Sequence, residues 1–226
     1  RKIRTPNIIR INNSEEEMIC VTDIMDNYVG NGMNNYCQST ITLKYMNKTL
    51  SNNIEGDVVE LGCFEGDTLF LMRYLLDSYK SDKKLYGYDS FIGLPKPCSK
   101  DNYDIKKHSD FSMQCGDMVA DYNRLLDNFN SRNLELPIIE KGWFKEINNY
   151  PDTISFAHFD GDLYDSILDS FDKVYDKMCL GGIIVIDDYD WEVTPGVKKA
   201  TEDYLQDKKE NGKVKIEWGK GIMVKE

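Results

Sequence analysis

Two strand-like segments that each end in acidic residues limit most strongly how this chain can fold. The apolar run at residues 154–159 ends in Asp160, and the run at residues 182–186 ends in Asp187 and Asp188. The residues between the runs carry apolar side chains at helical spacing, which is typical of the crossover in a β-α-β unit. Because parallel strands end at the same edge of a sheet, we expect the three acids to lie together at the carboxyl edge, where open α/β sheets bind ligands.

This group of three acids indicates a metal site. Hard divalent cations such as Mg²⁺ prefer carboxylate oxygens and keep open positions for water or substrate. A single aspartate after a strand more often caps a helix or faces solvent, but three at neighbouring strand ends favour a function. The sequence therefore predicts that Asp160, Asp187 and Asp188 hold a divalent cation.

A glycine-containing turn follows the first predicted strand, residues 57–62, and precedes an amphipathic helix. A turn of this kind brings backbone N–H groups and the positive end of a helix dipole toward a ligand. Gly62 and Gly66 are spaced G-x-x-x-G, which departs from the G-x-G-x-x-G of dinucleotide sites and disfavours a dehydrogenase. Glu60, near the end of the strand, would repel a pyrophosphate but suits an amine-bearing ligand.

The second predicted strand, residues 84–89, also ends in an acid. A carboxylate at this position commonly accepts hydrogen bonds from ribose hydroxyls, so Asp89 indicates a nucleoside ligand without a diphosphate. Trp143, in a turn after the third predicted strand, is a candidate for stacking on an adenine ring, and packing in the core is the equal alternative.

The strand and helix signals together predict an α/β protein. Residues 54–226 alternate strands and helices, as expected for a Rossmann-like, mostly parallel sheet flanked by helices, and they end in an antiparallel hairpin. Residues 1–53 form an N-terminal helical extension that we expect to cover the site or to join subunits of a homodimer or higher homo-oligomer. Residues 95–115 show little periodicity, which is typical of a functional lid or a disordered loop.

Composition and net charge limit the cellular compartment and the binding partners that we expect. The formal net charge is −11, which argues against nucleic acid or an anionic membrane as a main partner, because both are bound through Lys and Arg. No apolar run approaches the ~20 residues that cross a bilayer, and we find no signal-peptide pattern. The six cysteines are scattered without a C-x-x-C pair, so we expect reduced thiols in the cytoplasm rather than disulfides or a zinc site.

Five motifs in a fixed order resemble those of the macrocin O-methyltransferase (TylF/MycF-type) family. They lie between residues 53 and 204, at Glu60–Gly66, Tyr88–Pro95, Lys141–Phe144, His158–Ser166 and Gly181–Tyr189. The resemblance implies the fold of class I S-adenosylmethionine-dependent methyltransferases. It also implies Mg²⁺-dependent transfer of a methyl group to a hydroxyl of a small molecule, often a sugar or glycoside in a biosynthetic pathway.

The resemblance implies which residues would bind the cofactor S-adenosylmethionine. The methionine part would be held by the turn after the first strand and the start of the helix, namely Glu60, Gly62, Cys63, Phe64, Gly66 and Thr68. The ribose and the adenine would be bound by residues after the second and third strands, namely Asp89, Ser90, Gly142 and Trp143. Asp160, on the strand nearest the methyl donor, would also contact the cofactor.

The resemblance places the metal and the proton acceptor at the acidic strand ends, since Asp160, Asp187 and Asp188 match the family's metal ligands. A methyl sulfonium is already a strong electrophile, so the protein needs to align donor and acceptor and to activate the hydroxyl. A bound Mg²⁺ would depress the pKa of that hydroxyl. We expect Asp160 to be both metal ligand and proton acceptor. His158 is the alternative acceptor, and a hydrogen-bonded position in the core is equally expected for it.

Two other functions fit parts of the pattern. The D-x-D sequence at residues 160–162 is similar to the motif of haloacid dehalogenase-type phosphatases, with Asp187 and Asp188 as a later acidic pair. The two groups lie too close in sequence to leave room for the intervening strands that this chemistry requires. A non-catalytic Rossmann-like binding module is the other alternative, and the retained acids argue against it.

Overall fold

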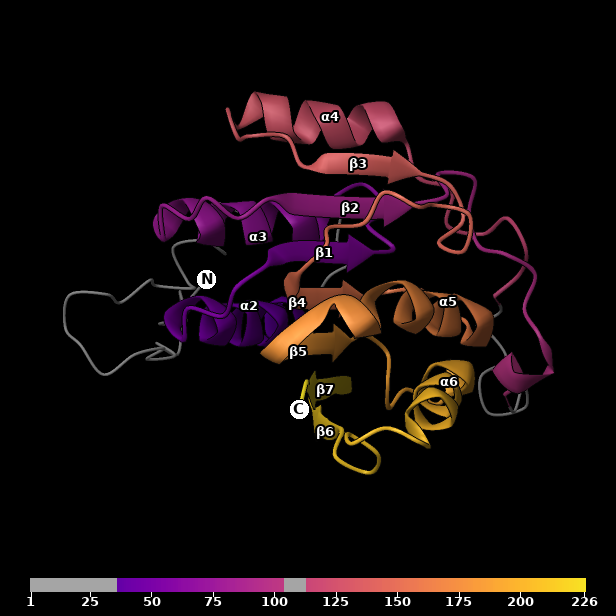
Figure 1. The fold of residues 1–226 in the computed structure, drawn as a ribbon. Helices are drawn as coiled ribbons and strands as arrows, with labels where there is room; N and C mark the ends of the chain where they lie inside the picture. Colours follow the sequence, from indigo (N-terminus) through magenta and orange to yellow (C-terminus); the bar gives the residue numbers. More distant parts are fainter. Residues whose placement is uncertain (1–35, 104–112) are drawn as a thin grey trace, which may run out of the picture.

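The computed structural model describes residues 36–103 and 113–226, which form an α/β fold around a seven-stranded sheet (Figure 1). The strand order is β3-β2-β1-β4-β5-β7-β6. Strands β1 to β5 run parallel, and β7 pairs antiparallel with both β5 and β6. The expected mostly parallel Rossmann-like sheet with a C-terminal antiparallel hairpin is therefore confirmed.

Short strands alternate with helices along the chain. The strands are β1 Asp57–Leu61, β2 Leu85–Asp89, β3 Ile138–Lys141, β4 Ile154–Phe159, β5 Met178–Ile186, β6 Lys215–Glu217 and β7 Lys220–Val224. The helices are α2 Tyr36–Ser51, α3 Asp67–Ser78, α4 Tyr122–Ser131, α5 Tyr164–Val174 and α6 Pro195–Leu205. Single turns of 3-10 helix lie at Ser99–Asp101 and Tyr175–Lys177.

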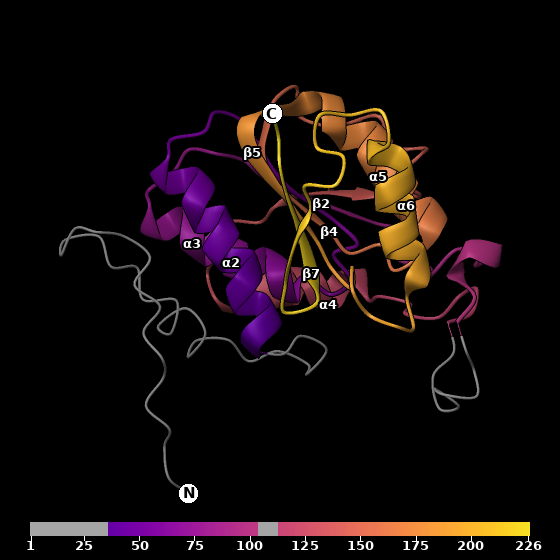
Figure 2. The same ribbon diagram turned by 90° about the horizontal axis from the view of Figure 1, so that it is seen from below.

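Helices cover both faces of the sheet. Figure 2 shows α2 and α3 on one side of the strands and α5 and α6 on the other, and α4 packs in the same core as α2 and α3. The central strands are buried on both faces, which explains why their sequences are continuous apolar runs. Along β5, Ile183 and Val185 belong to the core beneath α2 and α3, whereas Ile184 and Ile186 belong to the core beneath α5 and α6.

The predicted N-terminal extension, residues 1–53, includes α2. The apolar side chains of α2 belong to the core of the sheet: Ile41, Leu43, Tyr45, Met46 and Leu50. Residues 1–35 of the extension lie outside the described residues, as does the segment 104–112 of the predicted lid. The roles expected for those two segments therefore stay predictions.

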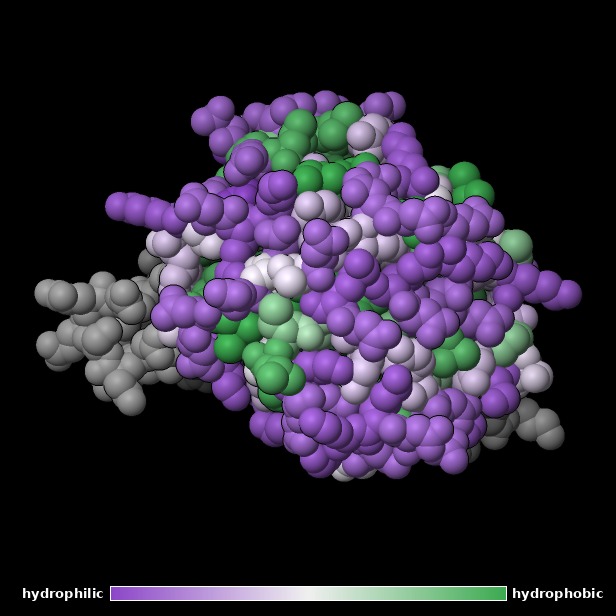
Figure 3. Space-filling view, in the orientation of Figure 1, coloured by the Kyte–Doolittle hydropathy of each residue, from purple (hydrophilic) through white to green (hydrophobic). Residues whose placement is uncertain are grey.

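The surface in the orientation of Figure 1 is mostly hydrophilic. Figure 3 shows apolar residues gathered over α4 and β3, and Ile138 in β3, the edge strand, is 37% exposed. Partly exposed apolar side chains are ordinary on a soluble protein. Among the helices of residues 36–103 and 113–226, none combines the length and the apolar character that a membrane-spanning helix needs.

The turn after β1 passes so close to the end of β4 that it requires glycine. Gly62 has a φ angle of 94°, and its N–H donates a hydrogen bond of 2.8 Å to the carbonyl of Tyr88. A Cβ atom at Gly62 would lie 1.8 Å from the carbonyl oxygen of Asp160. Only glycine allows both the positive φ angle and this close approach. With glycine at this position, the turn and Asp160 lie side by side at the centre of the carboxyl edge.

Candidate active site

A large cavity opens at the carboxyl edge of the sheet, and its volume is about 1000 Å³. It spans the point where the strand order reverses between β1 and β4, which is where open α/β sheets bind ligands. The residues predicted from the sequence to bind the cofactor or the metal line this cavity, with the exception of Gly66. His158, the alternative proton acceptor, does not line it either.

Asp89 joins the ends of β1 and β2 on one side of the cavity. Its Oδ2 accepts a hydrogen bond of 2.8 Å from the N–H of Phe64, and its Oδ1 accepts one of 2.8 Å from the N–H of Phe91. Burial raises the pKa of Asp89, and these backbone hydrogen bonds oppose the rise. The carboxylate is thus fixed at the cavity wall, where a hydroxyl donor of a ligand can reach it.

Ser90 and Trp143 lie on the same side of the cavity as Asp89. The Ser90 hydroxyl donates to the Gly93 carbonyl at 2.8 Å, so it also shapes the loop after β2. Trp143 is partly exposed on the cavity wall and belongs to neither of the two core clusters. Between the two candidate positions for Trp143, the structure therefore favours the cavity over the core.

The residues around the turn after β1 take different positions. Cys63 and Thr68 are buried and line the cavity. Gly66 precedes the first turn of α3 with a φ angle of 85°, and a Cβ there would lie 3.0 Å from the Leu125 side chain. Gly66 therefore supports the start of α3 rather than forming the cavity wall.

Glu60 presents one buried oxygen that has no protein partner. Its Oε1 lies 2.9 Å from His158 Nδ1, whereas Oε2 has no hydrogen-bond partner among the described residues. Glu60 is 1% exposed and lines the cavity. Because a buried oxygen without a partner is costly, Oε2 marks a place for a hydrogen-bond donor on a ligand, such as an amine.

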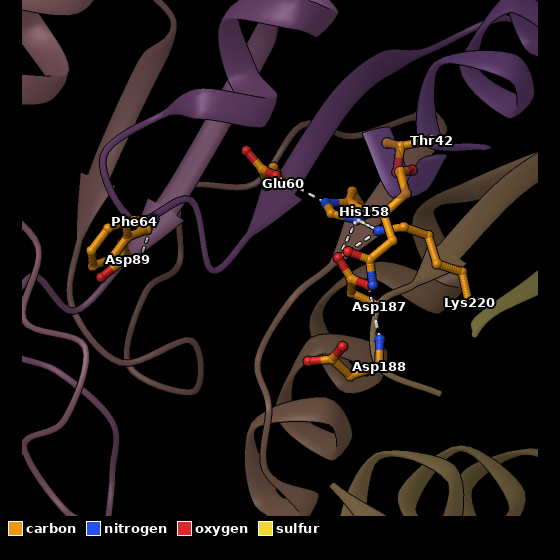
Figure 4. A network of polar contacts seen from close by, with 9 residues as sticks. Thr42, Glu60, Phe64, Asp89, His158, Asp187, Asp188 and Lys220 are labelled. Atoms are coloured by element: carbon orange, nitrogen blue, oxygen red, sulfur yellow. Dashed lines mark hydrogen bonds and ion pairs between the residues drawn. The ribbon is translucent and has the colours of Figure 1, made fainter. Parts of the chain in front are cut away.

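Glu60 is the first of four buried ionisable residues in a row that crosses β1, β4, β5 and β7 (Figure 4). The row continues through His158, Asp187 and Lys220. His158 Nε2 lies 3.6 Å from Asp187 Oδ2 and 3.4 Å from Lys220 Nζ, and Lys220 Nζ donates to Asp187 Oδ2 at 2.5 Å. Both ring nitrogens of His158 thus face protein groups beneath the cavity floor.

His158 and the acids at the ends of β4 and β5 form two overlapping groups, and within each group the possible ligand atoms lie within 4.8 Å of one another. One group is His158, Asp160 and Asp187, and the other is Asp160, Asp162 and Asp188. The structure therefore brings Asp160 together with Asp187 in one group and with Asp188 in the other. Asp162 and Asp188 have φ angles of 59° and 53°, an uncommon conformation for residues other than glycine that often marks functional sites.

Among the described residues, no Lys or Arg forms an ion pair with the group of Asp160, Asp162 and Asp188. Burial, and then repulsion from neighbouring aspartates, raises the pKa of Asp160 and Asp162 well above the usual range. The same two causes raise the pKa of Asp188 to about 7. A bound divalent cation would balance the negative charge of these carboxylates and allow them to ionise together. Because carboxylate oxygens are also the ligands that Mg²⁺ prefers, these residues fit Mg²⁺.

Sequence reasoning missed Asp162 and Lys220. Asp162 lies in the family motif at His158–Ser166 and in the D-x-D sequence of the phosphatase alternative, but neither led us to predict it as a metal ligand. Lys220 begins β7, and nothing in its local sequence indicates that it is buried beside Asp187. Only the pairing register of β7 with β5 could have placed it there.

Comparison with known proteins connects this chain to a family. Residues 40–220 match the family model described as Macrocin-O-methyltransferase (TylF). Demethyldecarbamoylnovobiocin O-methyltransferase of Streptomyces niveus is 31% identical over 160 residues, which cover 69% of this chain and 60% of the relative. The 8-demethyl-8-(2,3-dimethoxy-alpha-L-rhamnosyl)-tetracenomycin-C 4'-O-methyltransferase of Streptomyces olivaceus is 25% identical over 174 residues, or 75% of this chain and 62% of the relative. The chain spans about three fifths of the length of these curated relatives.

A solved structure supports the same connection. The O-methyltransferase NovP superposes on this chain with a TM-score of 0.70 and 25% sequence identity, covering 83% of this chain and 78% of NovP. With the seven-stranded sheet and its antiparallel C-terminal part, this likeness confirms the class I methyltransferase fold.

Proposed function

The chain belongs to the macrocin O-methyltransferase (TylF) family, and from this membership we propose that it is an S-adenosylmethionine-dependent O-methyltransferase. The family resemblance of the five sequence motifs is thereby confirmed. We propose a sugar or glycoside hydroxyl as the acceptor, because the name of the tetracenomycin relative specifies a rhamnosyl compound and a 4'-O-methyl transfer.

One observation carries this proposal: a single cavity joins a nucleoside-type site to a group of aspartates. On one side, Glu60 Oε2 would accept a hydrogen bond from the amino group of the cofactor, and the fixed Asp89 carboxylate would accept from ribose hydroxyls. On the other side, Asp160 lies directly against the turn after β1. S-adenosylmethionine supplies an electrophilic methyl group when bound, and the residues of the chain align it with an acceptor.

We propose Mg²⁺ as the metal at the acidic edge. The set predicted from the sequence was Asp160, Asp187 and Asp188, and the geometry adds Asp162 as a further candidate ligand. A divalent cation there would stabilise the developing alkoxide of the acceptor. Asp160 is the one residue common to both groups, so we propose that it binds the metal in either group.

Asp160 is also the proton acceptor that the geometry favours. It lines the cavity beside the turn after β1, so its carboxylate is placed next to the expected position of the methyl donor, where it can accept a proton from the acceptor hydroxyl. His158 is 1% exposed and turns both ring nitrogens toward protein groups. We therefore propose that Asp160 takes the proton and that His158 holds its neighbours in place.

Methyl transfer itself is the test. The full chain would be incubated with S-adenosylmethionine, Mg²⁺ and a panel of rhamnosides and other glycosides, and products that gain one methyl group would be detected by mass spectrometry. We expect transfer by the wild type, none by Asp160→Asn, and normal transfer by Asp172→Asn, which changes an exposed acid on α5.

The proposed acceptor class would be rejected if the protein binds S-adenosylhomocysteine but methylates no compound of the panel. Activity against phosphate esters without cofactor binding would instead favour the phosphatase.

A further inference from the structure

Lys220 is a lysine held inside the fold next to the acidic edge. The antiparallel pairing of β7 with β5 aligns Gly221 with Ile186, which places Lys220 opposite Asp187. The Lys220 side chain is 2% exposed, and its Nζ donates to Asp187 Oδ2 at 2.5 Å (Figure 4). An ammonium group buried this deeply is costly unless it is paired, so Asp187 is its fixed partner.

Of the aspartates in the two groups at this edge, only Asp187 is in an ion pair among the described residues. Asp187 Oδ1 accepts a hydrogen bond of 2.9 Å from the N–H of Asp188, so both oxygens of Asp187 have protein partners. Within the described residues, the ion pairs to Lys or Arg include Asp187 but none of the neighbouring aspartates, Asp160, Asp162 and Asp188. Lysines 96 and 145 also line the cavity, but their side chains are exposed.

The charge of Lys220 acts on the edge as a whole. Burial acts to raise the pKa of the carboxyl groups around it, and the Lys220 charge opposes this effect at Glu60, Asp160, Asp187 and Asp188. Lys220 itself does not line the cavity, so it acts on a ligand only through its neighbours.

We propose that Lys220 is the built-in counter-ion of the acidic edge. It is a positioning residue that fixes the Asp187 carboxylate, and its charge competes with a divalent cation bound by the neighbouring aspartates. Lys220 thereby keeps the edge folded before the metal binds and limits how tightly the metal is held. This inference rests on the proposed function only through the metal site.

The variant Lys220→Met removes the charge and keeps a side chain of similar length. In that variant, a bound Mg²⁺ would provide the compensation that Lys220 provides in the wild type. We therefore expect Mg²⁺ to raise the melting temperature of Lys220→Met more than that of the wild type. We also expect the Mg²⁺ dissociation constant to fall by about tenfold, because a like charge beside the cation has been removed. Both quantities would be measured on the full chain without cofactor, by thermal unfolding and by calorimetric titration with MgCl₂.

Lys215→Met is the matched control, because Lys215 lies on the same hairpin but its exposed side chain pairs with Glu217. Its response to Mg²⁺ should equal that of the wild type, and Lys220→Arg, which keeps the charge, should also respond as the wild type does. Should Lys220→Met fail to fold, Lys220→Gln would take its place, because it also removes the charge but keeps an amide that can donate a hydrogen bond to Asp187. Mg²⁺ should then bind more tightly to Lys220→Gln than to the wild type.

An Mg²⁺ response of Lys220→Met that is equal to or smaller than that of the wild type would overturn the inference. A smaller response would mean that Lys220 serves only to orient Asp187 as a ligand. An equal response would mean that the charge of Lys220 does not affect the affinity for the metal. Stabilisation of the wild type by S-adenosylhomocysteine would be measured separately. Its absence would count against the proposed function and leave the comparison of the Mg²⁺ responses intact.

Discussion

The backbone N–H of Phe64 donates a hydrogen bond of 2.8 Å to Asp89 Oδ2, which joins the turn after β1 to the end of β2 (Figure 4). Phe64 has a φ angle of 46°, so the turn adopts an uncommon conformation that this hydrogen bond helps to hold. The other oxygen of Asp89 is held by the N–H of Phe91. Both loops that would bind the nucleoside are therefore organised by one carboxylate.

Asp89→Asn should weaken cofactor binding, because an amide cannot accept hydrogen bonds from both loops as the carboxylate does. We expect the dissociation constant for S-adenosylhomocysteine, measured by calorimetric titration, to rise about tenfold or more, which corresponds to the loss of ~1–2 kcal/mol. Asp117→Asn is the control, since Asp117 also accepts a backbone N–H, from Gln114 at 2.8 Å, but does not line the cavity. Unchanged affinity in Asp89→Asn would contradict the role assigned to this carboxylate.

Gly62→Ala should destabilise the protein strongly, because the new Cβ would lie 1.8 Å from the carbonyl oxygen of Asp160. We expect the free energy of unfolding, measured with urea, to fall by more than ~3 kcal/mol. Gly212→Ala also places a side chain at a positive φ angle, 69°, but has nothing within 4 Å, so it should cost only about 1 kcal/mol. Similar losses in the two variants would mean that the close approach to β4 is not what requires glycine.

His158→Leu should destabilise the fold, because it leaves the buried Glu60 carboxyl without its hydrogen-bond partner. We expect the free energy of unfolding to fall by about 3 kcal/mol, the usual cost of removing one member of a buried polar pair. Ser155→Ala on the same strand removes a neutral hydroxyl that donates to the carbonyls of Gly56 and Asp57, and it should cost about 1 kcal/mol. A His158→Leu variant with normal stability and no turnover would point to His158 as the proton acceptor instead.

The metal-free protein should become less stable as the pH rises from about 4 to about 7. The pKa of Asp188 in the folded protein, about 7, lies above its ordinary value of 3.8, so the folded state binds more protons than the unfolded state in this window. Stability is therefore greatest below the ordinary pKa and lost as Asp188 ionises, by about 4 kcal/mol at most. Thermal unfolding in EDTA at pH 5 and pH 8 would measure the loss, and excess Mg²⁺ at pH 8 should reverse it.

Asp188→Asn is the variant that tests this pH dependence. Asparagine tolerates the φ angle of 53° at this position and carries no charge, so the loss of stability between pH 5 and pH 8 should be smaller than in the wild type. Asp172→Asn, on the exposed side of α5, should keep the wild-type pH dependence. Equal pH dependence in all three proteins would show that Asp188 does not titrate in this range.

The sequence predicted the parts of the site that follow from strand order alone. Asp160 and the Asp187–Asp188 pair meet because they end β4 and β5, which are parallel neighbours, and Asp89 ends β2 on the other side of the cavity. Short apolar runs between helical stretches were enough to predict such a sheet.

The features of the site that sequence reasoning could not place depend on long-range register and on side-chain direction. Lys220 reaches Asp187 only because β7 pairs with β5 in one particular register, which the hairpin sequence does not encode locally. His158 lies in β4, two residues before Asp160, but β4 ends at Phe159, so Asp160 lines the cavity whereas His158 lies beneath it. The unpartnered oxygen of Glu60 likewise appears only when its neighbours are placed.

A crystal structure of the full chain grown with S-adenosylhomocysteine and Mg²⁺ would test the central claim most directly. We predict that the amino group of the ligand lies within hydrogen-bond distance of Glu60 Oε2, that its ribose meets Asp89, and that the metal contacts Asp160. A ligand bound elsewhere on the protein, or a metal coordinated away from Asp160, would contradict the account.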